Sequence, residues 1–198
     1  MASANPNAKL ERAQEQVEQH PDSPKAHFNL GLAYSKRGAL APAEAAYRKA
    51  LELDPDLVEA WVNLGGVLML RWDFKGSLEA NREALKRKED SVLAHYNLGQ
   101  ACLYLGDAQG VVNANRRVIE LDPQNAAGHY FLAVGLLPLG QVEEAREAAA
   151  RSQEMGHSPA PDFLRVLHEA EVKVAEQKSK GVIKQIGADA PDEPNRRN

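Results

Sequence analysis

The sequence predicts an all-α fold made of stacked repeats, and three observations indicate it. The stretch 24–56 recurs along the chain, so that Leu30-Gly31 returns 34 residues later as Leu64-Gly65 and again as Leu98-Gly99. The letters ELDP at 52–55 return at 120–123. Apolar residues in 8–19 follow a helical spacing. A self-similarity of this period is typical of solenoids, so we expect one helical repeat array.

The elements follow in order from this period. Ser23 is the expected N-cap of the first repeat, with Pro24 at its first helical position. After Lys178 the chain is poor in large apolar groups and rich in charge, which indicates a flexible segment. We therefore expect a flexible start at 1–7, a half-repeat at 8–23, repeats at 24–57, 58–91, 92–125 and 126–159, a capping helix at 160–178 and a flexible tail at 179–198.

The composition limits the classes of partner. The chain has 198 residues, 43% hydrophobic content and a net charge of -4, with no basic run. Neither nucleic acid nor an anionic membrane is therefore expected as the main partner. No apolar run is long enough for membrane insertion, and the first residues lack the apolar region of a secretory signal. The single Cys102 fits a reducing compartment, so we expect a cytoplasmic protein.

The repeat also resembles a known family. An aromatic residue or His at its fourth position, Leu-Gly after it, and then Tyr34, Ala43, Tyr47, Ala50 and Pro55 resemble the tetratricopeptide repeat. That resemblance implies antiparallel helix pairs in a right-handed superhelix, with the first helix of each pair on the concave face. It also implies a non-catalytic scaffold that binds another protein or peptide, here an extended or helical apolar segment. Self-assembly through the same apolar surfaces is the alternative.

The resemblance also implies which side chains face the groove. Asn29, Asn63 and Asn97 share one position and would form a ladder of amides that bonds a peptide backbone. The Lys and Asn clamp of family members that dock chaperone carboxylate tails is matched only at Asn63, so that mode is disfavoured. The predicted groove residues are Lys25, Phe28, Asn29, Leu32, Lys36, Glu59, Val62, Asn63, Met69, Leu93, Tyr96, Asn97, Gln100, Tyr104, Tyr130 and Phe131.

Two constellations could carry chemistry. His27, His95 and His129 share the fourth position, but stacked repeats lie about 10 Å apart. Metal ligands must lie within about 2.1 Å of one ion, so we interpret these rings as structural. Cys102 follows His95 by two turns, yet a buried thiol without an orienting partner is inert. We therefore predict no catalytic residue, no cofactor and no metal site.

Two further positions depart from the repeat. Asn81 and Asn115 replace Tyr47 in the middle repeats, and we interpret them as buried, satisfied amides rather than ligand contacts. Trp72 stands at the inter-helix turn where other repeats have Gly38 or Gly106. Either the turn is built differently and the ring packs on the core, or the ring is exposed; we expect the packed ring.

Overall fold

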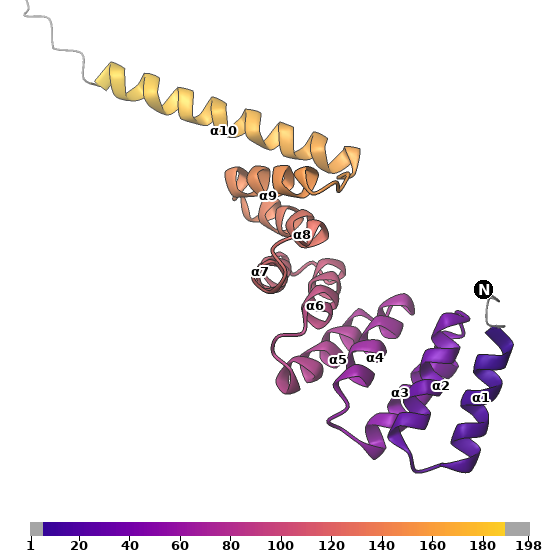
Figure 1. Ribbon diagram of the computed structural model, residues 1–198. Helices are drawn as coiled ribbons and strands as arrows, with labels where there is room; N and C mark the ends of the chain where they lie inside the picture. Colours follow the sequence, from indigo (N-terminus) through magenta and orange to yellow (C-terminus); the bar gives the residue numbers. More distant parts are fainter. Residues whose placement is uncertain (1–5, 189–198) are drawn as a thin grey trace, which may run out of the picture.

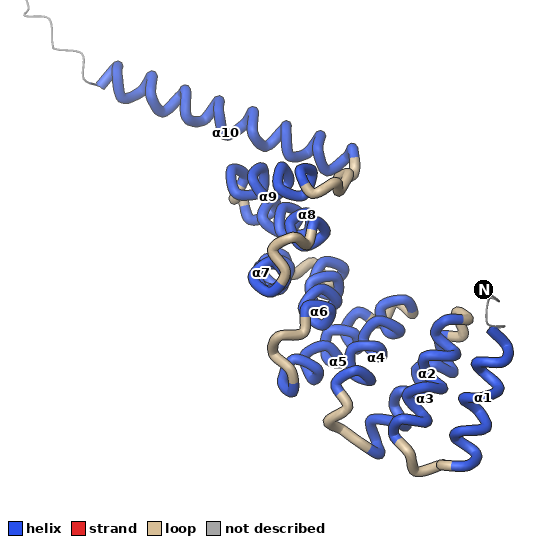
Figure 2. The backbone as a smooth tube through the Cα atoms, viewed as in Figure 1, coloured by secondary structure: helices blue, strands red, loops and turns tan. Residues whose placement is uncertain are grey.

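The computed structural model describes residues 6–188, and every regular element in that range is helical, as the sequence predicts (Figure 2). A single 3-10 turn, η1, interrupts the α-helices at Leu137–Leu139. The α-helices are α1 (Pro6–Gln19), α2 (Pro24–Lys36), α3 (Leu40–Leu53), α4 (Val58–Leu70), α5 (Phe74–Arg87), α6 (Val92–Tyr104), α7 (Ala108–Leu121), α8 (Ala126–Leu136), α9 (Val142–Glu154) and α10 (Pro161–Ala188).

The helices stack as hairpins along one axis (Figure 1). The pairs α2–α3, α4–α5, α6–α7 and α8–α9 make the densest packing, with α1 against α2 and α10 against α9. The first helices of successive hairpins also touch, α2 with α4, α4 with α6, and α6 with α8. We therefore take these four first helices as the inner face of the array.

Small residues let the two helices of each hairpin approach closely. A Cβ on Gly31 would overlap the ring of Tyr47, and a Cβ on Gly65 would overlap the amide of Asn81. Ser23 caps α2 by accepting the Ala26 N–H at 3.3 Å, with Pro24 in the first turn, as predicted. The repeated Leu-Gly pair therefore marks a close helix crossing in each of the first three repeats.

The turn at Trp72 differs from the expectation. Trp72 has φ 64°, close to the 71° of Gly38 and the 75° of Gly106, so the turn is built as in the other repeats. Its N–H donates to Met69 O, and the Asp73 N–H donates to Leu68 O. The side chain is 75% exposed, so the prediction of a packed ring is wrong. These two hydrogen bonds fix the backbone of the turn, so the side chain of Trp72 projects from the outer surface.

The chain ends depart from the predicted boundaries. α10 continues to Ala188, ten residues past the predicted end of the capping helix at 178. No proline follows Pro161 until Pro191, so nothing in this stretch breaks the helical hydrogen bonding. In Figure 1 the later turns of α10 extend past α9. Helix α1 begins at Pro6, within the predicted flexible start. The remainder of the predicted flexible ends, 1–5 and 189–198, lies outside the described residues.

Candidate functional site: the inner face

The ring at the fourth position of each repeat has the same structural role. In every repeat a ring nitrogen contacts the backbone carbonyl six residues earlier, in the loop that follows the preceding helix. This contact holds successive hairpins together and occupies one nitrogen of each imidazole. No group of three potential metal ligands occurs within the part of the chain that the structure describes. The four contacts are His27 to Pro21 O at 2.7 Å, Trp61 to Pro55 O at 2.8 Å, His95 to Glu89 O at 2.8 Å and His129 to Pro123 O at 3.2 Å.

The thiol of Cys102 is held in its neutral form. Burial raises the pKa of Cys102 above its ordinary value, and the nearby Asp107 carboxylate raises that pKa further. The thiolate is the nucleophilic form of cysteine. With the ring of His95 bonded to Glu89 O, the side chains of Cys102 and His95 are packing and hydrogen-bonding groups of α6.

The two buried asparagines differ in how well they are satisfied. Each Nδ2 donates to the carbonyl four residues earlier, Asn81 to Ser77 and Asn115 to Val111, both at 2.8 Å. Asn81 Oδ1 also accepts from Asn97 Nδ2 at 3.4 Å. Asn115 Oδ1 is buried and has no hydrogen-bond partner. The interpretation as a satisfied amide therefore holds for Asn81 and only in part for Asn115.

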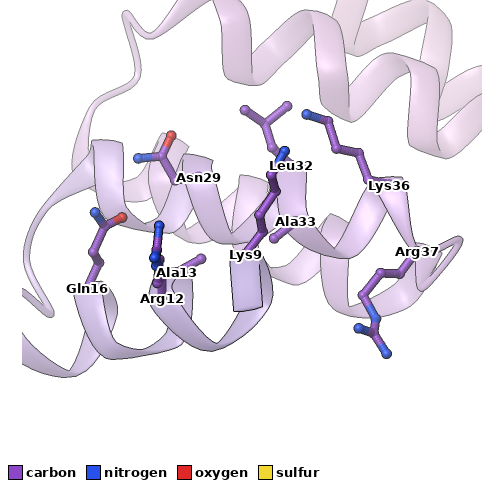
Figure 3. Close-up of a pocket in the computed structure, with 9 residues that line it drawn as sticks. All are labelled: Lys9, Arg12, Ala13, Gln16, Asn29, Leu32, Ala33, Lys36 and Arg37. Atoms are coloured by element: carbon purple, nitrogen blue, oxygen red, sulfur yellow. The ribbon is translucent and has the colours of Figure 1, made fainter. Parts of the chain in front are cut away.

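The N-terminal end of the inner face carries a pocket of about 420 Å³ between α1 and α2 (Figure 3). Three predicted groove residues, Asn29, Leu32 and Lys36, line it from α2. Helix α1 is fixed there by buried Ala13 and by a hydrogen bond from Gln14 Nε2 to Tyr34 Oη at 3.4 Å. Its contribution to the site was missed, because only the first helix of each repeat was expected to line the groove. The pocket also contains Lys9, Arg12, Ala13, Gln16, Ala33 and Arg37.

The C-terminal end of the inner face carries a row of aromatic rings. Tyr96 of α6 meets Phe131 of α8 edge to face, with ring centroids 5.9 Å apart. Tyr130 contacts Phe131 at 5.0 Å and Phe163 of α10 at 5.4 Å. Burial raises the pKa of the Tyr96 hydroxyl, which therefore remains protonated at neutral pH. The rings are half-buried, so each packs against its neighbours and still presents an edge or face to solvent.

The remaining predicted groove residues are distributed unevenly. Val62 is only 6% exposed and packs against Ala84 and Ala94, so its assignment to the groove is wrong. Its side chain points toward α5 and α6 because those helices present small residues there. By contrast, Leu93 and Tyr104 are each 57% exposed. Lys25, Phe28 and Glu59 line a second pocket of about 470 Å³, and Met69 lies beside Tyr104 in a third. Gln100 is half-buried.

The three asparagines of the predicted ladder have different surroundings. Asn29 lines the pocket between α1 and α2. Asn63 Nδ2 donates to Glu59 O of its own helix at 2.7 Å. Asn97 donates to Asn81, as described above. The three asparagines are therefore equally spaced in the sequence, but their amides are not equally free to bond a ligand.

Comparison with known proteins agrees with this architecture. Residues 24–57 and 92–125 each match a family model of the tetratricopeptide repeat, and these ranges coincide with the first and third predicted repeats. No curated protein sequence matches the chain significantly. Within the described residues, no helix is long and apolar enough to cross a bilayer.

Solved structures share the fold at low identity. YrrB, a TPR protein, superposes with a TM-score of 0.73 at 22% identity over 85% of both chains. A MamA structure gives 0.71 at 18% identity over 74% of this chain and 85% of its own. MamA from Desulfovibrio magneticus RS-1 gives 0.72 at 21% identity over 77% and 86%. With its stacked hairpins and its two matched repeats, the chain is a tetratricopeptide-repeat protein.

Proposed function

We propose that this repeat array is a non-catalytic interaction scaffold that binds an extended or helical apolar segment of another protein along its inner face. The observation that carries the proposal is the aromatic row of Tyr96, Tyr130 and Phe131 beside exposed Leu93. Tetratricopeptide repeats support an interaction scaffold in general, and YrrB is described as having an unusual peptide-binding site.

The chemistry of the row suits an apolar ligand. Tyr rings offer a large contact area and lose little conformational entropy on binding, because they have few rotatable bonds. Tyr96 and Phe131 are already held by each other, which reduces the ordering cost further. Half-buried amides on the same face, Asn29 and Gln100 among them, supply donors and acceptors for the backbone of an extended segment.

A peptide-display selection on the full chain tests this proposal. Recovered peptides should be apolar, and calorimetry should show that Leu93→Ser with Gln100→Ala weakens their binding by about tenfold or more, or about 1.4 kcal/mol. The matched control is Leu105→Ser, which removes an exposed leucine that lies outside the predicted groove. Equal binding to the parent and to the groove variant would contradict the proposal.

Self-assembly is the competing function, because large apolar side chains are exposed at Leu70, Trp72, Leu93 and Tyr104. Light scattering after size exclusion, over a range of concentrations, separates the two. A monomer that binds the selected peptides supports the scaffold. An oligomer that resists dilution, and that Leu93→Ser dissociates, would assign the inner face to contacts between copies.

A further inference from the structure

We propose that the pocket between α1 and α2 binds an acidic stretch of the partner polypeptide, with at least two Asp or Glu side chains. This inference rests on the proposed function, since it assigns a ligand chemistry to one end of the same inner face. It concerns a site half formed by α1, a helix that precedes the first repeat. Three cations, Lys9, Arg12 and Lys36, line this pocket.

The three cations converge from two helices. Lys9 and Arg12 lie three positions apart on α1, so their side chains leave the same side of the helix. Figure 3 shows both rising from α1 on the side of the cavity, while Lys36 reaches back from the end of α2 toward Leu32. Arg37 lines the pocket but points away from it in the same view. The positive charge in the cavity therefore comes from Lys9, Arg12 and Lys36.

These charges have no acidic counterpart in the pocket. Its lining contains no Asp or Glu, and α2 has none in its whole length. The acidic residues of α1 are Glu11, Glu15 and Glu18. Glu11 and Glu18 lie on the side of α1 opposite Lys9, and Glu15, three positions after Arg12, is not among the residues that line the pocket. No ion pair within the described part of the chain involves Lys9, Arg12 or Lys36. A ligand carboxylate would relieve the repulsion between them.

The other residues that line the pocket favour an acidic peptide as the ligand. Leu32, Ala13 and Ala33 give the cavity an apolar floor, which suits the aliphatic part of a Glu side chain. Asn29 and Gln16 add amides that can bond a peptide backbone. The volume of about 420 Å³ is at the small end of ligand pockets, enough for a few side chains. Three cations on two helices accommodate more than one carboxylate.

Fluorescence anisotropy with two matched peptides tests the site on the full chain. One labelled probe contains three consecutive Glu residues between Ala and Leu, and the other has Gln at those positions; both are acetylated and amidated. We expect the Glu probe to bind the parent at least about tenfold more tightly than the Gln probe at low salt. Its affinity should fall as NaCl rises, because partly exposed ion pairs are screened.

The variants localise the binding. Lys9→Gln, Arg12→Gln and Lys36→Gln together should weaken the Glu probe by about tenfold or more, with an unchanged melting temperature. Lys75→Gln, Lys88→Gln and Lys173→Gln together remove the same charge from exposed positions outside the pocket and should change affinity by less than about twofold. Equal binding of the two probes to the parent would overturn the inference, as would equal loss of affinity in both triple variants.

The result is separable from that of the proposed function. The pocket triple leaves Leu93, Tyr96 and Gln100 intact, so apolar peptides from the display selection should still bind it if the aromatic row is the main site. Glu-probe binding that is lost in the pocket triple, with no apolar ligand found, would support the acidic site and contradict the apolar one. Binding of apolar peptides with no preference for the Glu probe would support the apolar site and contradict the acidic one.

Discussion

The two ends of the inner face use one backbone design for different chemistry. At the α1–α2 end, flexible cations surround an open pocket above a small apolar floor. At the α6–α8–α10 end, aromatic rings touch one another across three helices. The contacts at the second end also hold the array together, whereas Lys9 and Lys36 make no ion pair within the described chain. We therefore expect substitutions at the aromatic end to affect both stability and the proposed binding, and those at the basic end to affect the proposed binding alone.

The largest loss of stability is expected at a helix crossing, because the packing of the hairpins supports both ends of the inner face. Gly65→Leu places a branched side chain at the crossing of α4 and α5, against Asn81. We expect a loss of about 3 kcal/mol or more in urea denaturation, because the helices must separate. The neighbouring Gly66 has open space around its missing Cβ, so Gly66→Ala should raise stability by up to about 1 kcal/mol. If Gly65→Leu matches the parent, the helix crossing is misplaced.

The comparison between the ends is tested most directly by one substitution at each. Tyr130 contacts Phe131, His157 and Phe163, so Tyr130→Ala should cost about 2 kcal/mol and loosen the start of α10. At the other end, Lys36→Gln should stay within about 0.5 kcal/mol of the parent. Urea denaturation gives both values, and hydrogen exchange reports the protection of α10. Similar stability losses in the two variants would show that the two ends contribute equally to the stability of the array.

A smaller effect is expected from the amides between the two ends. Asn97→Ala removes the group that bonds Asn81 Oδ1, leaving a buried acceptor without its partner, and should cost about 1 kcal/mol. Asn63→Ala removes only a bond to the carbonyl of its own helix and should cost less than about 0.5 kcal/mol. Thermal melting of both variants measures the difference. Equal stability losses in the two variants would contradict this difference and support a ladder of equivalent amides.

The sequence predicts the hairpins well because the residues that pack the two helices of a hairpin together recur at a fixed period. Leu30-Gly31 and its repeats mark the helix crossings. The same register predicts Asn29, Leu32 and Lys36 as groove residues, and all three line the pocket between α1 and α2. The contribution of α1 was missed although its signal is present, since Lys9 and Arg12, three positions apart, lie on the same side of the helix. The burial of Val62 could not be found this way, because it depends on Ala84 and Ala94 in two other helices.

Trp72 lies between the two ends, and there the smallest effect is expected. A residue other than glycine at φ 64° carries a cost of about 1–2 kcal/mol, while glycine loses more chain entropy on folding, about 0.5–1 kcal/mol. The ring is 75% exposed and contacts the rings of Phe74 and Tyr104 in edge-to-face geometry, with centroids 5.9 and 6.3 Å away. Trp72→Gly should therefore raise the free energy of unfolding by about 0.5 kcal/mol.

The reciprocal change at the next repeat serves as its control. Gly106 has φ 75° and open space around its missing Cβ, so Gly106→Ala adds strain without a clash and should cost about 1 kcal/mol. Urea denaturation should show a higher free energy of unfolding for Trp72→Gly than for the parent, and a lower one for Gly106→Ala. A loss of more than about 1 kcal/mol in Trp72→Gly would mean that the ring stabilises the surface formed with Phe74 and Tyr104. The middle of the array would then resemble the aromatic end rather than the basic one.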